Sequence, residues 1–100
     1  MEEHELLVLS GKDAGKAFPL GGSCVRVGSG PANDVRLTDD TVSSSHVSIE
    51  QTKDGYLLKD LGSTNGTRVN GVPVVEAFLL RGADLTLGDT RLRFQQRQKH

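Results

Sequence analysis

Short apolar segments, separated by turns that contain glycine, asparagine or aspartate, are the feature that most constrains the fold of this chain. Residues 24–27 alternate in polarity with the period of two that is expected of a half-buried strand. The twelve glycines are spread over the breaks between such segments, and no long segment has the period of an amphipathic helix. The pattern predicts an all-β fold, an antiparallel β-sandwich.

The same pattern gives the expected strands and turns. We expect strands at residues 5–10, 17–20, 24–27, 35–37, 47–49, 56–58, 67–69, 85–87 and 92–94. Hairpin turns are expected at Asp54-Gly55, at Asn70-Gly71 and at residues 88–90. Residues 73–80 are ambiguous: we interpret them as a strand entering a loop, with a helical turn as the alternative. Residues 95–100 are polar and are expected to fray or to begin a linker.

Length and charge limit the classes of function. One hundred residues make a single domain, residues 1–100, with a core over about residues 6–94. Twelve Lys and Arg against thirteen Asp and Glu give a net charge of −1, so no global field attracts nucleic acid or an anionic membrane. No apolar run approaches the roughly 18 residues of a membrane span, and the acidic start is unlike a signal peptide. We expect a cytoplasmic location.

Cys24 is the only cysteine. A single cysteine excludes an intrachain disulfide and a cysteine-rich zinc site, and it fits a reducing compartment. We interpret Cys24 as a small strand residue, of the kind that is commonly buried. No cofactor is expected.

Two polar clusters interrupt the strand pattern, at residues 43–46 (Ser-Ser-Ser-His) and at residues 62–66 (Gly-Ser-Thr-Asn-Gly). Hydroxyl and amide groups on loops can bind phosphate or a peptide backbone without a deep pocket. The clusters therefore predict one binding surface carried by two loops. Two alternatives stay open: Ser43 and Ser44 could satisfy local backbone groups, and Asn65-Gly66 could be only a turn.

An enzyme and a metal site are weaker interpretations. A serine next to His46 suggests a hydrolase, but adjacent residues of a strand point to opposite faces, and no nucleophile elbow is present. Asp39-Asp40 lacks further spaced ligands and is interpreted as a solvated turn. We expect neither catalysis nor a bound metal.

The order of several fragments resembles the forkhead-associated (FHA) domain family. These are Val27-Gly28, Asn33-Asp34-Val35, Val42 to His46, Asp60 to Thr67, and Val69-Asn70-Gly71. The resemblance runs from about residue 6 to residue 94. It implies a sandwich of about eleven short strands with the binding loops at one end, and it implies recognition of phosphothreonine peptides.

The resemblance also implies roles for individual residues. Ser43 and Thr64 occupy positions that contact phosphate, and Asn65 occupies a position that clamps the ligand backbone. Gly28, His46 and Gly66 match structural positions, the glycines for turn geometry and the histidine for bracing the loop.

Two departures from the family bear on the ligand. The family usually has arginine at the positions of Ser29 and Ser44, so both expected phosphate cations are missing. Hydrogen bonds to charged groups contribute about 1.5–3 kcal/mol against roughly 1 for neutral ones, so we expect weakened phosphate selectivity. Arg26, Arg36 and Arg68 are candidate replacements. Alternation places the first two on an outer sheet face, which leaves Arg68 as the best of the three candidates. The alternative, which we favour, is that Arg68 is a solvated charge at the end of a strand.

We therefore expect a non-catalytic interaction module of a signalling or regulatory protein, with a protein or peptide partner that carries phosphothreonine. The alternative is a phosphate-independent assembly or autoinhibitory docking domain, including self-association. Residues 28–35 and 61–67 also resemble bacterial FHA domains at the start of sigma-54-dependent transcription activators.

Overall fold

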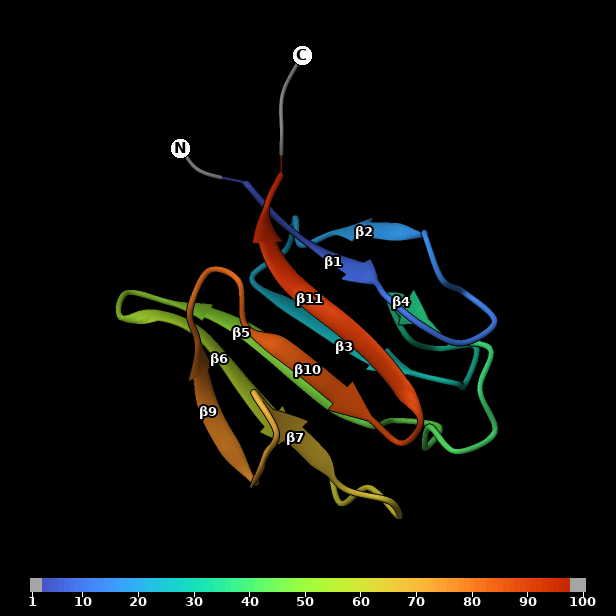
Figure 1. Cartoon of the computed structure of the whole chain (residues 1–100). Coiled ribbons are helices and arrows are strands. Elements are labelled where there is room, and N and C mark those ends of the chain that lie inside the picture. Colours follow the sequence, from blue (N-terminus) through green and yellow to red (C-terminus); the bar gives the residue numbers. More distant parts are fainter. Residues whose placement is uncertain (1–2, 98–100) are drawn as a thin grey trace.

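The computed structural model describes residues 3–97, which form eleven strands in two packed sheets (Figure 1). The strands are β1 (His4–Val8), β2 (Ala17–Pro19), β3 (Cys24–Gly28), β4 (Val35–Arg36), β5 (Val47–Thr52), β6 (Gly55–Asp60), β7 (Thr67–Val69), β8 (Val72–Val74), β9 (Glu76–Leu79), β10 (Asp84–Leu87) and β11 (Thr90–Gln96). One sheet has the order β2-β1-β11-β10-β7-β8, and the other β4-β3-β5-β6-β9. The predicted β-sandwich is confirmed.

The core follows the alternation seen in the sequence. In β3, Val25 and Val27 are buried between the sheets while Cys24 and Arg26 are exposed. The expectation of a buried Cys24 is wrong, because alternation places it beside Arg26 on the outer face. Phe94 and Leu58, from opposite sheets, are at most 1% exposed. Each such side chain contributes about 1.5–3 kcal/mol when fully buried.

All three predicted hairpins are present, joining β5 to β6, β7 to β8 and β10 to β11. At the β7–β8 turn, Asn70 and Gly71 have φ angles of 52° and 82°. Positive φ at both central residues is the requirement of a type I′ turn, which Asn-Gly meets at little cost.

The structure differs from the sequence-based expectations in three places. Residues 73–80 contain the end of β8 and the whole of β9, with Val75 between them, where the chain passes from one sheet to the other. The β3–β4 pair is parallel in an otherwise antiparallel fold. Gln95 and Gln96 belong to β11, because they pair with β1 through registers such as His4↔Gln96. Arg97 follows the strand and its amide donates to the Glu3 carbonyl oxygen at 2.7 Å, whereas residues 98–100 of the expected tail lie outside the described residues.

The two chain ends and the candidate loops lie at opposite ends of the sandwich (Figure 1). β1 and β11 run side by side and carry both ends of the chain at the top of the view, whereas the segments after β4 and β6 lie far from them. Residues 3–97 contain no helix long and apolar enough to cross a membrane.

Candidate functional site

The two polar clusters meet at the loop end of the sandwich. Five of the six predicted binding residues line one shallow hollow of about 440 Å³: Ser29, Ser43, Ser44, Thr64 and Asn65. Asp40, Thr41 and Val42 complete its lining. The sixth predicted residue, Arg68, lines a neighbouring hollow of about 560 Å³ that shares Thr41 and Asn65 with the first.

His46 joins the two loops from beneath. Its side chain is fully buried, its Nδ1 accepts a hydrogen bond from the Ser43 amide at 3.1 Å, and its Nε2 lies 2.9 Å from the Gly66 carbonyl oxygen. A carbonyl oxygen can only accept, so the ring is the neutral tautomer with its proton on Nε2. This imidazole therefore braces both loops, and neither ring nitrogen is left for a ligand.

Hydroxyl groups are the donors that face the hollow. The Ser43 Oγ accepts a hydrogen bond from the Thr64 amide at 3.0 Å, which leaves its own hydroxyl proton for a ligand. Within residues 3–97 the exposed Ser44 and Thr64 hydroxyls have no hydrogen-bond partner. The rim thus offers three hydroxyl groups that a ligand could engage.

Asn65 is oriented by the chain itself. Its Nδ2 donates to the Thr41 carbonyl oxygen at 2.8 Å. One of its two side-chain N–H groups is therefore engaged within the domain, which leaves the second N–H to donate to a ligand and Oδ1 to accept from one. The neighbouring Gly66 has a φ of 82°, which suits its place in the turn because glycine adopts this region readily.

Gly28 has a different role from the turn geometry that we expected. It is the last residue of β3, and a Cβ built there would lie 2.3 Å from the Ser44 carbonyl oxygen. The loop packs directly on the strand at this point. Asn33 Nδ2 donates to the same Ser44 oxygen, and Ser29 Oγ donates to the Val42 carbonyl oxygen at 2.7 Å. The Ser29 hydroxyl proton is thereby engaged within the domain.

Asp60 organises the second loop, a role that the sequence reasoning missed. Its carboxylate accepts hydrogen bonds from the Gly62 and Ser63 amides and from the Ser63 and Thr67 hydroxyls, at 2.6–2.8 Å. Burial raises the pKa of Asp60, but these four hydrogen bonds outweigh it and lower the pKa to about 2. An aspartate two residues before a glycine is a signal for such an Asx turn.

Asp39 is likewise structural, so the expected solvated turn is wrong for this residue. Its carboxylate accepts hydrogen bonds from the Thr41 amide and from the Thr41 and Thr90 hydroxyls. Burial raises the pKa of Asp39, and these bonds, with the charge of Lys12, more than offset it, so that the pKa is lowered. The neighbouring Asp40 is exposed and is one of the residues that line the hollow. Residues 3–97 hold no group of three or more His, Cys, Asp or Glu side chains suited to a metal ion.

Among residues 3–97, no lysine or arginine lines the hollow. Arg26 is on the outer face of β3, as expected. Arg36 was expected on the outer face, away from the loops, but its Nε donates to the Ser29 carbonyl oxygen at 3.2 Å, so its guanidinium lies beside the segment between β3 and β4. Arg68 lines the neighbouring hollow, together with Asn65, and does not line the first one.

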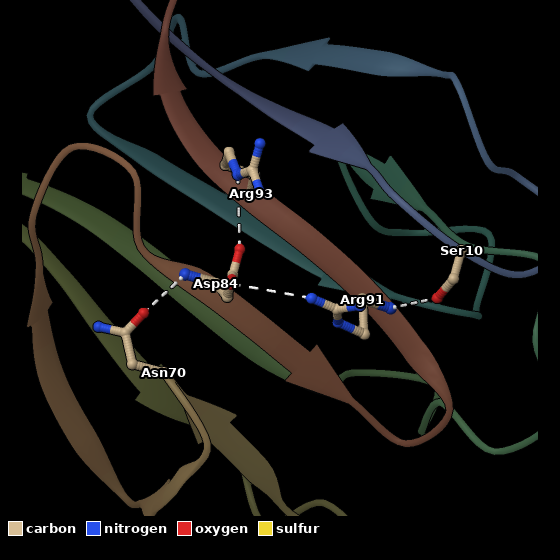
Figure 2. A network of polar contacts seen from close by, with 5 residues as sticks. All are labelled: Ser10, Asn70, Asp84, Arg91 and Arg93. Carbon is tan, nitrogen blue, oxygen red and sulfur yellow. Dashed lines mark hydrogen bonds and ion pairs between the residues drawn. The ribbon is translucent and has the colours of Figure 1, made fainter.

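Two further arginines lie on the outer face of the six-stranded sheet, where both form ion pairs with the same aspartate (Figure 2). The guanidinium groups of Arg91 and Arg93 lie 3.8 and 3.5 Å from the Asp84 carboxylate. The backbone amide of Asp84 donates a hydrogen bond to Asn70 Oδ1. Ser10 Oγ accepts a bond from the Arg91 amide. Such partly exposed ion pairs contribute little to stability, but they pair both guanidinium groups with Asp84.

Comparison with known proteins identifies the family. A family model described as "Inner membrane component of T3SS, cytoplasmic domain" matches residues 7–98. The chain belongs to this family. Its fold is the FHA fold: a solved structure from a study of phosphothreonine-dependent FHA domain interactions is 32% identical, with a TM-score of 0.87, and the match covers 97% of this chain and 99% of that one.

Two curated relatives are regulators by name. The oxoglutarate dehydrogenase inhibitor of Corynebacterium jeikeium is 37% identical over 89 residues, which are 89% of this chain and 62% of that protein. The glycogen accumulation regulator GarA of Mycobacterium tuberculosis is also 37% identical over 89 residues, 89% of this chain and 55% of that protein. This FHA chain therefore spans little more than half of the relatives that it matches.

Proposed function

We propose that this FHA domain is a non-catalytic interaction module that binds a threonine-containing segment of a partner protein at its loop end, with only modest preference for the phosphorylated form. The observation that carries the proposal is the convergence of Ser29, Ser43, Ser44, Thr64 and Asn65 on one hollow. Ser43, Ser44 and Thr64 supply hydroxyl donors to a phosphate or hydroxyl group, and the Asn65 Oδ1 accepts from a ligand amide.

The charge of the hollow supports a modest phosphate preference. A phosphothreonine carries about −1.5 to −2 charges at pH 7, and the charged side chain that lines the hollow is Asp40, which repels it. Arg36, whose Nε donates to the carbonyl oxygen of Ser29, supplies a positive charge beside a residue of the hollow. Neutral donors contribute roughly 1 kcal/mol each, so we expect phosphorylation of the threonine to raise affinity by less than about tenfold.

The direct test is calorimetry against a library of phosphothreonine peptides, each paired with its unphosphorylated counterpart. We expect at least one pair to bind, with both members within about tenfold of each other. Ser43→Ala is expected to weaken binding of both peptides, whereas Ser45→Ala, an exposed neighbour outside the hollow, is the matched control. Binding that is unchanged in Ser43→Ala would exclude this site, and failure of every peptide pair would exclude peptide recognition.

A gain-of-function variant tests the electrostatic part separately. Ser44→Arg places a cation on the exposed rim, at a position where the family usually has one. We expect it to raise the phosphorylated-to-plain affinity ratio about tenfold, the equivalent of roughly 1.4 kcal/mol, and to leave plain threonine binding little changed. An equal gain for both peptides would mean that the ligand phosphate does not sit beside Ser44.

The regulatory setting is the broadest part of the proposal. The names of the relatives, an inhibitor and a regulator, support a role in signalling, and a cytoplasmic location fits such a role. The sigma-54-dependent activator context, with its transcriptional role, stays a prediction from sequence resemblance. Sequencing the gene beyond His100 tests it: an ATPase domain of that class supports the assignment, and a different continuation removes it.

A further inference from the structure

The four outer edges of the two sheets are protected to very different degrees. An open edge strand exposes unpaired amide and carbonyl groups, and natural proteins blunt such edges with short strands, proline or basic residues. β4 has two residues, while β2 and β8 have three each and contain Pro19 and Pro73. β9 is longer, with four residues, and its sequence Glu76–Leu79 contains no proline, lysine or arginine. β9 is therefore the unprotected edge.

The free backbone groups of β9 can be assigned from its pairing with β6. The Val75 carbonyl oxygen accepts a hydrogen bond from the Asp60 amide at 2.8 Å, so this residue faces β6. Backbone groups alternate in direction along an antiparallel strand, and the register pairs Leu57 with Phe78. The amide and carbonyl groups of Glu76 and Phe78 consequently point outward, away from the sheet.

Large apolar side chains lie along the same edge. Phe78 is 50% exposed, and Leu80, just beyond the strand, is 77% exposed. On the other side of Phe78 lies its cross-strand neighbour Leu57, which is half-buried on the outer face of the sheet. An exposed apolar row next to free backbone groups is the arrangement that strand addition uses.

The pattern along this edge is complementary to itself. An antiparallel copy centred on Phe78 would create the row Leu57–Phe78–Phe78–Leu57 across four strands. Glu76 would lie opposite Leu80 of the copy, and it keeps its ion pair with Lys59, at 4.0 Å. The two Glu76 residues would be four positions, or about 14 Å, apart along the strands, beyond the screening length of about 8 Å at physiological salt. Apolar groups thus meet at the centre while like charges stay apart.

We propose that β9 pairs with β9 of a second copy of this chain, antiparallel and centred on Phe78, so that the two five-stranded sheets become one continuous sheet. The contact is small compared with the roughly 1,200–2,000 Å² of a stable interface, so the dimer is weak, with a dissociation constant on the order of 0.1 mM. The loop-end hollow takes no part in the contact, which makes self-association independent of peptide binding.

Sedimentation equilibrium of the chain from about 10 μM to 2 mM, in the Cys24→Ser background to exclude disulfide dimers, tests the proposal over the range set by that affinity. We expect the mass to rise from that of one 10.7 kDa chain towards twice that value. Phe78→Lys is expected to remain monomeric, and Val72→Ser, which removes an apolar side chain 59% exposed on β8, is expected to dimerise normally. A monomer at every concentration, or a dimer that survives Phe78→Lys, would overturn the proposal.

Cross-linking tests the register. In the same background, Phe78→Cys places two cysteines opposite each other, with Cα atoms about 5.5 Å apart, within the range that a disulfide spans. Under mild oxidation we expect Phe78→Cys to form a covalent dimer and Val72→Cys to remain largely monomeric. Equal cross-linking of both variants would show that the contact is not centred on β9, and circular dichroism of each variant establishes that it is folded.

Discussion

Beneath the hollow, His46 and Asp60 have every side-chain nitrogen or oxygen in a hydrogen bond within the domain, whereas Ser44 and Thr64 on the rim keep unpartnered hydroxyls. Both layers are polar and belong to the same two loops. The difference is that the lower layer is committed to holding the loops and the upper layer is available to a ligand. Changes below should therefore cost stability, and changes above should cost binding.

Gly28→Ala should have the largest effect on the lower layer. The added Cβ would meet the Ser44 carbonyl oxygen at 2.3 Å, and backbone must move to relieve the overlap. We expect a loss of about 3 kcal/mol in the free energy of unfolding, measured by urea denaturation. Gly30→Ala, whose Cβ would lie 3.1 Å from the same oxygen, is the milder control. Equal stability of Gly28→Ala and the unmodified chain would contradict this packing of loop on strand.

His46→Ala should have the second-largest effect on stability, because it removes both hydrogen bonds by which the His46 side chain joins the two loops. It leaves the Ser43 amide and the Gly66 carbonyl without their partner, and we expect a loss of about 2–3 kcal/mol in the free energy of unfolding together with weaker peptide binding. Thermal denaturation and the peptide titration measure the two effects. Ser45→Ala, next to it and exposed, should change neither. A stable variant with intact binding would show that the loops hold their positions independently.

The pH dependence of stability should reveal the Asp60 network. Because the pKa of Asp60 in the folded chain is about 2, below its ordinary value of 3.8, the unfolded chain takes up the proton first as pH falls. The stabilisation is complete above about pH 4 and is lost towards pH 2, by about 1–2 kcal/mol. Urea titrations at several pH values should show a shallower acid dependence in Asp60→Asn. Asp54→Asn, in the exposed β5–β6 turn, is the control, and identical pH profiles for the two variants would refute the network's role.

Thr64→Val should have the smallest effect on stability and so separates the layers most cleanly. The substitution keeps the side-chain shape and removes a hydroxyl that has no partner in the described part of the chain. We expect the free energy of unfolding to change by less than about 0.5 kcal/mol, while the affinity for the best peptide of the library falls severalfold. A large loss of stability would place this hydroxyl in the lower layer after all.

The fold was predictable because its signals are local. Alternation in residues 24–27 and the Asn70-Gly71 turn each specify a strand or hairpin without reference to distant residues. The break between two strands at Val75 was not predicted, because the chain passes there from one sheet to the other. Whether an apolar run is interrupted in this way depends on the strands with which its two halves pair, and these lie elsewhere in the sequence. Gln95 and Gln96 escaped because polar residues are held in β11 by β1, which lies at the other end of the sequence.

The meeting of the two polar loops was predictable from the sequence, but their hydrogen bonds were not. Sequence resemblance placed Ser43, Thr64 and Asn65, and the structure brings them to one hollow. The hydrogen-bond partner of the Asn65 side chain is the Thr41 carbonyl oxygen, which lies 24 residues away in the sequence. No local sequence pattern predicts this contact. Arg36 was misplaced for a similar reason: strand alternation fixes where a side chain starts, whereas a long arginine reaches a loop that only the tertiary fold brings near.

The imidazole between Ser43 and Gly66 has a consequence for the thermodynamics of recognition. Two loops that are about twenty residues apart would lose conformational freedom on binding if each had to be ordered by the ligand. Because His46 already ties one to the other, that entropy is lost when the chain folds, and the rim is preorganised. Even a ligand that gains little from its phosphate then meets a surface that needs almost no rearrangement.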